Sequence, residues 1–402
     1  MPPISGELAH RCGRLIAAAA GLREQLPPET RLALAPLVEQ VNCYYSNLIE
    51  GQHTYPDEVE AVLRRARDQE PATTTATSPR PAARSLAIEG AAHIETQRLL
   101  VKRLRSDPAW DPTAPANLCE LHQWFIERLP AEMRHATSRS GHLTVPIVPG
   151  AWRTTPVEVG EHVPPDHACL PAFLDTFHHA YASHTSLTPE TLVRIAAAHH
   201  RLVWIHPFVD GNGRVARLMT DAMFERAKVG ADGLWRISRG FARTNKQYKS
   251  LLAAADEQRH HDADGRGNLS QEALVRWCDY MIEQAIDQAT FMGSLIRPPE
   301  LRFRIMRWAD RRGDEPRVGR LLCEVMLRGT IERNEAAEIL GTSERHALRL
   351  INALIRDGVV DTKPHAPLRP RIPLTVAPHW FPDLFPAAIE MRLETHRPVD
   401  SA

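Results

Sequence analysis

The sequence predicts a mainly helical protein with one small β-hairpin and a separate C-terminal module. Apolar residues recur every three or four positions in several long stretches, the spacing of one face of an α-helix. Apolar and polar residues alternate in residues 139–168, on either side of a Pro149-Gly150 turn. Near the C-terminus, Gly341 separates two short helical stretches. The predicted fold class is therefore all-α with a hairpin.

Composition sets broad limits on function. A chain of 402 residues is long enough for two or three domains, and 43% hydrophobic with 24% charged residues is ordinary globular composition. Lys+Arg and Asp+Glu both number 49, so no overall field favours nucleic acid or a membrane. The 6 cysteines form no CxxC pair, which indicates reduced, mostly buried thiols in a cytoplasmic protein. We expect no membrane span, and residues 1–21 are too alanine-rich to favour the alternative of a signal peptide.

Residues 206–217 concentrate the polar chemistry of the chain between two helices. The first helix is predicted over 188–205, with Thr188 as N-cap and Pro189 in the first helical position. Pro207 and Gly211 then end it, and a second helix follows. The intervening turn therefore lies at a helix N-terminus, where free N–H groups favour anions.

The residue types in this turn are those that phosphate chemistry needs. Gly211-Asn212-Gly213 lets the backbone approach a phosphate closely, and Arg214 and Arg217 lie on one side of the second helix. Asp210 is a candidate Mg²⁺ ligand, and His206 is a candidate general base. Taken singly, each residue also fits a glycine-rich helix corner with a buried histidine.

Residues 206–217 match the signature His-Pro-Phe-x-Asp/Glu-Gly-Asn-Gly-Arg-x-x-Arg of the Fic family, which the chain therefore resembles. The resemblance implies the Fic fold, with ATP as substrate and Mg²⁺ as cofactor. AMP would pass to a Ser, Thr or Tyr hydroxyl of a target protein, or of the chain itself. The resemblance implies that His206 is the general base, that Asp210 binds the metal, and that Phe208 anchors the loop. It further implies that the phosphates are held by the backbone of Gly211, Asn212 and Gly213, and that the β- and γ-phosphates are bound by Arg214 and Arg217. Relatives that transfer phosphate tend to carry lysine at the position of Gly213.

Tyr248 lies in a stretch that resembles the adenine-contacting part of the family. Relatives often have two adjacent aromatic residues there, whereas this chain has Gln247 before Tyr248. The adenine contacts are therefore less defined than the phosphate contacts.

A second resemblance lies near the N-terminus. Residues 1–68 have helical spacing, and Ser46, Glu50 and Gly51 match the inhibitory pattern Ser/Thr-x-x-x-Glu-Gly/Asn of many Fic proteins. The resemblance implies that Glu50 pairs with Arg217 and keeps it from the γ-phosphate. The alternative is a surface glutamate before a glycine that ends the helix.

Three other segments carry weaker signals. Residues 140–148 and 152–159 resemble the family's hairpin flap, which could hold a target peptide by strand addition, although an ordinary surface hairpin has the same pattern. Residues 260–267 resemble a calcium loop, but Arg266 and Ala273 occupy ligand positions, so we expect a solvated loop. Residues 69–85 are rich in Thr, Pro and Ala and predict an exposed flexible loop.

Beyond residue 300 the chain resembles a winged helix-turn-helix, with wing strands expected at 359–360 and 372–376. Between Arg333 and Arg371 the net charge is only +2, from seven basic and five acidic residues, so DNA binding has weak electrostatic support. Such modules also serve as dimerisation or protein-docking elements, and a homodimer is a further expectation.

We therefore expect three domains. They are an N-terminal helical region over 1–115 with the inhibitory helix at about 34–51, a catalytic core over 116–290, and the winged-helix-like module over 300–402. Protein AMPylation is the favoured function. Removal of AMP, transfer of another phosphate-containing group, and a nucleotide-sensing DNA-binding regulator are the alternatives.

Overall fold

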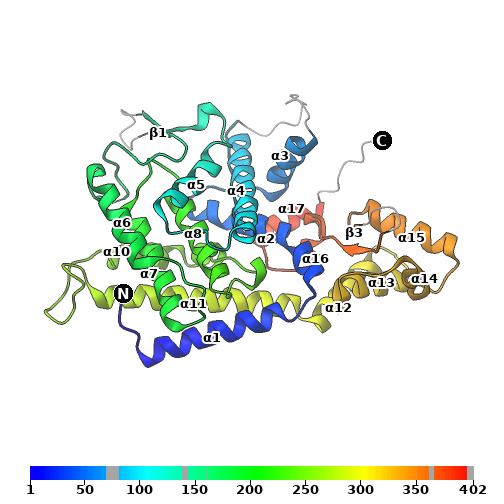
Figure 1. The fold of residues 1–402 in the computed structure, drawn as a ribbon. Coiled ribbons are helices and arrows are strands. Elements are labelled where there is room, and N and C mark those ends of the chain that lie inside the picture. The colour runs from blue at the N-terminus through cyan, green and yellow to red at the C-terminus, as the bar shows by residue number, and fades with distance from the viewer. Residues whose placement is uncertain (69–80, 138–143, 161, 362–365, 396–402) are drawn as a thin grey trace. The chain divides into compact units, whose positions relative to one another are not determined.

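The computed structural model describes residues 1–68, 81–137, 144–160, 162–361 and 366–395 (Figure 1). It is built almost entirely of helices, with two short antiparallel strand pairs among the described residues. The larger helices are α1 (Gly6–Arg23), α2 (Pro28–Ile49), α3 (Pro56–Asp68), α4 (Pro81–Ser106), α5 (Pro115–Ile126), α6 (Leu170–Tyr181), α7 (Pro189–Ile205), α8 (Asn212–Arg226), α9 (Ser238–Arg243), α10 (Asn245–Ala254), α11 (Gln271–Ile296), α12 (Pro298–Arg311), α13 (Pro316–Arg328), α14 (Arg333–Leu340), α15 (Glu344–Arg356), α16 (Ala377–Trp380) and α17 (Ala387–Thr395).

The shorter elements connect these helices. The strands are β1 (His135–Thr137), β2 (Thr144–Pro146), β3 (Val360–Asp361) and β4 (Arg369–Pro370). Single 3₁₀ turns are η1 (Ala131–Met133), η2 (His167–Cys169), η3 (Ala231–Gly233) and η4 (Leu374–Val376). No helix within the described ranges is long and apolar enough to cross a membrane.

The packing divides the chain into two compact units. Unit 1 comprises Met1–Ala17, Asn42–Gly230 and Arg236–Gln288, and unit 2 comprises Ala18–Val41, Ala231–Trp235 and Ala289–Ala402. Residues 18–41 belong to the same unit as the C-terminal part of the chain, and the three domain ranges expected from the sequence stay a prediction. Every residue of the predicted site belongs to unit 1.

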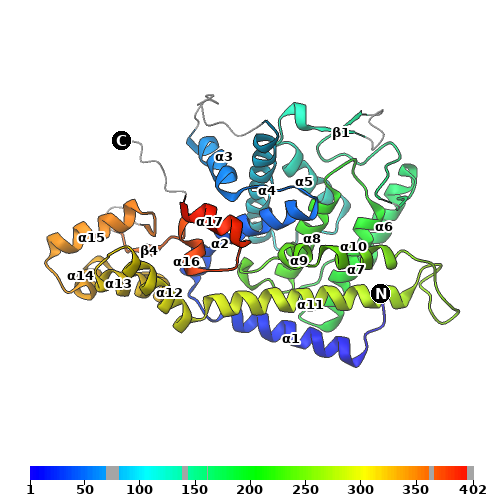
Figure 2. The same cartoon turned by 180° about the vertical axis from the view of Figure 1, so that it is seen from behind.

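Helices α7 and α8 form the centre of unit 1 and pack against each other (Figures 1 and 2). Thr188 caps α7 as predicted, because its side-chain oxygen accepts a hydrogen bond from the amide of Thr191 at 3.3 Å. Both helices are buried on nearly every side, including polar positions such as His199 and Arg217. A helix that is buried all round needs partners for its polar side chains, and those partners build the site described below.

A pair of strands is present in this region, but the predicted pairing of residues 140–148 with 152–159 was wrong. β1 pairs with β2 in an antiparallel register that joins Ala136 to Val145, whereas residues 152–159 form no regular strand. The backbone amide of Arg153 instead donates to the carbonyl of Pro207 at 2.9 Å, so this segment is tied to the motif loop. The expected strand at 140–143 lies outside the described residues.

Helix α4 begins at Pro81, four residues before the predicted start at Ser85. Proline suits the first position of a helix because its missing N–H has no partner there in any case. The rest of the predicted flexible loop, residues 69–80, lies outside the described part of the chain.

Unit 2 contains the expected helix, turn and helix. α14 ends at Leu340, the next residue, Gly341, is left-handed with φ of +56°, and α15 follows. β3 pairs with β4 at 369–370, so the prediction of a strand at 372–376 was wrong. Pro370 and Pro373 have no N–H to extend the ladder, and Leu374–Val376 forms a 3₁₀ turn. The winged-helix assignment itself stays a prediction.

All six cysteines are free, and four of them are buried, in agreement with the sequence.

Candidate active site

The loop between α7 and α8 is fixed by left-handed residues at both ends. His206 follows α7 with φ of 50°, and Gly211 precedes α8 with φ of 81°. The side chain of Asn212 closes the loop, because its oxygen accepts from the amide of Phe208 and its nitrogen donates to the Phe208 carbonyl, each at 2.9 Å. The N-cap residue of α8 is Gly211, which has no side chain to cap the helix, and the first N–H groups of a helix have no partner within it. The loop therefore offers backbone donors to an anion.

The stacked rings of Phe208 and His122 anchor this loop. Phe208 is 0% exposed, and its ring lies 3.9 Å from the ring of His122, nearly parallel to it. Nδ1 of His122 accepts from the amide of Gly150 at 3.0 Å, so the neutral ring carries its proton on Nε2, which lies 3.2 Å from the carbonyl oxygen of Asp210. His122 thus joins the loop to the segment after β2. Burial lowers the pKa of His122 to about 4 and keeps the ring neutral.

Arg153 is a second tie to the loop. Its Nε donates to the carbonyl of His206 at 2.8 Å, and its side chain is buried. A guanidinium has no acceptor and presents its donors in a fixed plane, so it suits the fixing of backbone carbonyls. Arg153 therefore orients the backbone that carries His206.

His206 has the protonation state that a general base needs. Loss of solvation lowers its pKa to about 4, and the nearby His162 and Arg153 act in the same direction. A neutral imidazole at physiological pH can accept a proton.

Arg217 is almost fully enclosed, at 1% exposure. Its Nη2 donates to Oε1 of Glu50 at 2.6 Å and to the carbonyl of Ser46 at 3.2 Å, and its Nε donates to Oγ of Ser46 at 3.0 Å. The pKa of Glu50 lies below its usual range, because Arg217, with Arg214 and Lys249, outweighs the desolvation that would raise it. The contact expected between the end of α2 and Arg217 is present.

Gly51 and Gly213 make this contact geometrically feasible. Gly51 turns the chain after α2 with φ of +79°. A Cβ atom at position 213 would lie 2.4 Å from Oε1 of Glu50 and 3.0 Å from Nη1 of Arg217. Any side chain at 213 would therefore displace the Glu50 carboxylate.

Arg214 is also occupied, by partners that the sequence did not indicate. Its Nη2 lies 2.5 Å from Oε1 of Glu89 and donates to Oε1 of Gln52 at 2.7 Å. Its guanidinium carbon lies 4.9 Å from the ring centre of Phe125. Glu89 and Gln52 therefore hold Arg214 in the site, as Ser46 and Glu50 hold Arg217.

Tyr248 lies deeper than expected. It is 4% exposed, its ring stacks on Phe241 at 4.4 Å, and its hydroxyl lies 3.1 Å from Nε2 of His199. A hydrogen bond between Tyr248 and Arg217 acts to lower the tyrosine pKa, although burial raises that pKa overall. The described contacts of Tyr248 thus support Arg217, and contact with adenine stays a prediction.

Asp210 fits the requirements of a magnesium ligand. Its side chain is exposed beside the loop, and one carboxylate oxygen, Oδ1, accepts the Gly211 amide at 2.6 Å. Mg²⁺ is commonly held by one or two carboxylates together with substrate phosphates and water. The second oxygen of Asp210 could serve in that way.

The family comparison matches the region that contains this loop. Residues 112–224 match the model of the Fic/DOC family. The chain carries a Fic domain. Among curated proteins it is 42% identical to the protein adenylyltransferase Fic of Drosophila grimshawi over 87 residues. That match spans 22% of this chain and only 18% of the length of the fly protein.

Solved structures of Fic proteins also align with the chain. A Fic family protein from Desulfovibrio desulfuricans aligns with a TM-score of 0.48 at 18% identity, over 92% of this chain and 96% of its own. A Fic domain containing signaling protein from Bacteroides thetaiotaomicron aligns with a TM-score of 0.49 at 17% identity, over 70% and 96% respectively.

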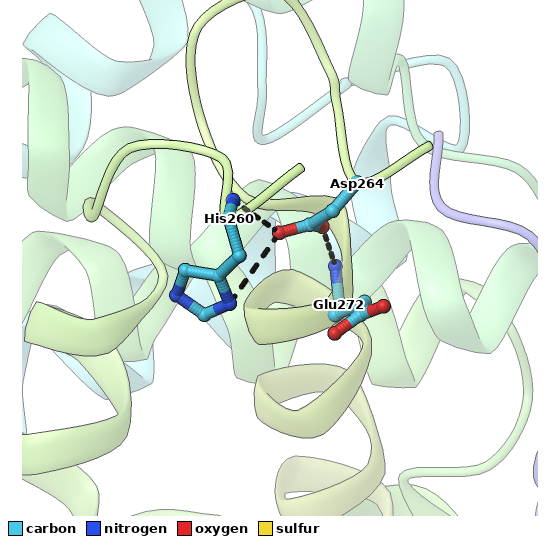
Figure 3. Close-up of side chains that lie close together, drawn as sticks. All are labelled: His260, Asp264 and Glu272. Atoms are coloured by element: carbon cyan, nitrogen blue, oxygen red, sulfur yellow. Dashed lines mark hydrogen bonds and ion pairs between the residues drawn. The ribbon is translucent and has the colours of Figure 1, made fainter. Parts of the chain in front are cut away.

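Outside the Fic motif, the described part of the chain has one cluster of potential metal ligands: His260, Asp264 and Glu272 (Figure 3). Asp264 is fully buried, and its carboxylate accepts the amides of His260 at 3.0 Å and Glu272 at 2.8 Å, and the hydroxyl of Ser270 at 2.8 Å. Both oxygens are already used to hold the loop before α11. The expectation of a solvated loop at 260–267 is therefore correct for residues 260–263 and Gly267, whereas Asp264 is buried and residues 265–266 are half-buried.

The sequence missed His122, Glu89 and Gln52 as parts of the Fic site. His122 and Glu89 lie on helices whose apolar spacing does not set them apart from other positions. His122 contacts the motif loop, and Glu89 contacts Arg214, only in the folded chain. His122 had one available signal, because a histidine among the apolar positions Leu118, Leu121 and Phe125 of a helix needs a buried partner.

Proposed function

We propose that this chain transfers AMP from ATP to a Ser, Thr or Tyr hydroxyl of a protein, and that the end of α2 restrains this activity. One observation carries the proposal: a neutral His206, an uncapped helix start and two arginines meet at the junction of α7 and α8. The Fic domain and the adenylyltransferase relative support the same chemistry.

In the proposed reaction, His206 takes the proton of the target hydroxyl. The hydroxyl oxygen then attacks the α-phosphorus of ATP, a new P–O ester bond forms, and the bond to the β-phosphate oxygen breaks to release pyrophosphate. The amides at the start of α8 and the guanidiniums of Arg214 and Arg217 would stabilise the charge that develops on the phosphates. Mg²⁺, when held by Asp210, would neutralise phosphate charge.

The proposed restraint follows from the contacts of Arg217. While its Nη2 is bonded to Glu50, it is not available to a γ-phosphate, and the carboxylate would repel that phosphate. ATP would then bind with its α-phosphorus poorly aligned for attack. Release of Glu50 is thus proposed as the activating step.

The hairpin β1–β2 is the proposed docking element for the target protein. Its strands have exposed positions at Thr137 and Thr144, and Val148 beside it is also exposed. An edge strand can bind an extended peptide through backbone hydrogen bonds, which would bring a hydroxyl towards His206.

ATP labelled at different phosphates tests the reaction. Retention of the α-phosphate label on protein supports AMP transfer, whereas retention of the γ-phosphate label would show phosphorylation instead. Loss of AMP from previously modified protein, with no label gained from ATP, would favour AMP removal. Retention of neither label, together with DNA binding, would favour the regulator.

A second candidate function is DNA binding by unit 2. Helix α15 has four exposed polar residues with the spacing of a single helix face, namely Arg345, Arg349, Asn352 and Arg356. A helix fits the major groove of DNA, where arginine reads guanine and asparagine reads adenine. Glu344, exposed at the start of the same helix, opposes this charge.

Fluorescence anisotropy of the whole chain with duplex DNA tests this second function. Binding should weaken steeply as salt rises, and Arg345→Glu with Arg349→Glu should abolish it, while Arg307→Glu on the exposed side of α12 should not. Light scattering of the same samples would show whether the chain is a homodimer, which is expected if the module serves in dimerisation instead of DNA binding.

A further inference from the structure

The same atom of Arg214 is bound by two elements of different kinds. Its Nη2 contacts Gln52, in the short segment that follows α2, and Glu89, in the middle of the long helix α4. Sequence and family pattern assign neither partner. Both lie in unit 1, as does Arg214.

Gln52 belongs to the same short segment as the residues that hold Arg217. The backbone N–H of Gln52 donates to the carbonyl of Asn47 at 2.9 Å, so the position of Gln52 is tied to the end of α2. Residues 46–52 therefore bond to Arg217 through Ser46 and Glu50, and to Arg214 through Gln52. A movement that removes Glu50 would also remove Gln52.

Glu89 is held by different contacts. Helix α4 packs against α8, which carries Arg214, and the buried neighbours Ala87 and Ala91 fix this part of α4 in the core. The Glu89 side chain is 13% exposed and that of Arg214 is 5% exposed. The pair would therefore remain when residues 46–52 move away.

The charges in the cradle balance while the segment is in place. Arg214 and Arg217 contribute two positive charges, and Glu50 and Glu89 contribute two negative ones, so the formal sum is zero. The Nε atom of Arg214 is buried and has no hydrogen-bond partner within the described residues. A buried donor of this kind is unusual unless a ligand completes its bonds.

We propose that Arg214 has a releasable partner, Gln52, and a permanent partner, Glu89. Gln52 is a second inhibitory contact, which leaves together with Glu50 and exposes Arg214 to the triphosphate. Glu89 is a positioning residue, which keeps the guanidinium of Arg214 directed into the cradle after the segment has left. This inference rests on the proposed AMP transfer and specifies how that site is regulated.

The two contacts predict opposite effects on one guanidinium. Gln52→Ala in the otherwise unchanged chain should tighten ATP binding and raise self-modification by about fivefold, the effect of losing one hydrogen bond of ordinary strength. Glu89→Gln in a Glu50→Gly background should weaken ATP binding by about tenfold. It should leave AMP binding unchanged, because AMP has no β- or γ-phosphate, and Glu89→Asp should restore part of the ATP affinity.

Calorimetric titration with ATP and with AMP measures both effects without requiring turnover. Gln271→Ala, another half-buried glutamine, and Glu95→Gln, which pairs with Arg98 in the same helix α4 at 2.6 Å, are matched controls and should leave both affinities unchanged. Thermal unfolding of each variant shows whether it is folded.

Two results would overturn the inference. One is a Gln52→Ala variant with parental ATP affinity while Glu50→Gly binds ATP more tightly. The other is a Glu89→Gln variant that binds ATP as its background does, or that loses ATP and AMP affinity equally. If Glu50→Gly transfers no label at all, the proposed AMP transfer fails, and the ATP and AMP affinities still decide the roles of Gln52 and Glu89.

Discussion

The Nη2 atom of Arg217 lies 2.6 Å from Oε1 of Glu50, although 167 residues separate them in the sequence. Ser46, one helical turn before Glu50, accepts a second bond from the same guanidinium. Three acceptor contacts from one helix end thus hold a nearly buried arginine that lies beside a free helix N-terminus. This contact is the basis of the proposed restraint on the site.

Removal of the carboxylate should activate the protein more than removal of the hydroxyl. We expect Glu50→Gly to raise self-modification by at least about tenfold, and Ser46→Ala to raise it only a few-fold, because hydrogen bonds between charged groups are stronger than those to neutral groups. Initial rates with labelled ATP measure the difference. Equal rates for Glu50→Gly and the parent chain would contradict the proposed restraint.

The activity of the Glu50→Gly variant should resist acid. Since the pKa of His206 is lowered to about 4, the imidazole stays neutral and able to accept a proton as pH falls from 8 to about 5. The rate should therefore be nearly flat over this range and fall only close to pH 4. A decline centred near the ordinary histidine value of about 6.5 would show that the base is not this buried ring. Circular dichroism at each pH checks that the chain remains folded.

The stability of the protein should fall with acid before its activity does. Burial lowers the pKa of His93 well below its usual value, that of His199 to about 3 and that of His122 to about 4. The unfolded chain binds protons at these groups below about pH 6.5 while the folded chain does not, so stability rises with pH between about 4 and 6.5.

Denaturant unfolding at pH 7 and pH 5 measures this slope, which is up to about 1.4 kcal/mol per pH unit for each such histidine. His93→Phe should reduce the slope, because both ring nitrogens of His93 are buried without hydrogen-bond partners in the described structure. His10→Asn, at an exposed position, should not change it. The same unfolding free energy at both pH values would contradict the account.

His122→Ala tests the support beneath the motif loop. Loss of the stack on Phe208 and of the bonds to Gly150 and Asp210 should lower the unfolding free energy by about 3 kcal/mol. It should also lower transfer by Glu50→Gly at least about tenfold, because a small displacement of reacting groups is costly. His179→Ala, an exposed histidine on α6, is the control. If His122→Ala were as stable as the parent chain, the motif loop would not depend on His122 for its stability.

Much of the fold could be predicted because its signals are local. The cap at Thr188, the break at Pro207 and Gly211, and the turn at Gly341 each depend on neighbouring residues only. The contact between Glu50 and Arg217 is long-range, and it was predictable only because both residues match family patterns.

The rest could not be predicted because it depends on distant packing. Gln52 and Arg214 are 162 positions apart, and His122 and the Asp210 carbonyl are 88 apart, with no periodic pattern that joins them. The hairpin was misplaced for the same reason. Alternation in residues 152–159 is real, but Arg153 uses its backbone and side-chain donors on the carbonyls of Pro207 and His206.

Intact-mass spectrometry of two variants after incubation with ATP and Mg²⁺ tests the central claim most directly. Glu50→Gly should gain the mass of one or more AMP groups, and Glu50→Gly combined with His206→Ala should gain none. No added mass in the first variant, or the same added mass in both, would contradict AMP transfer by His206 under the control of Glu50.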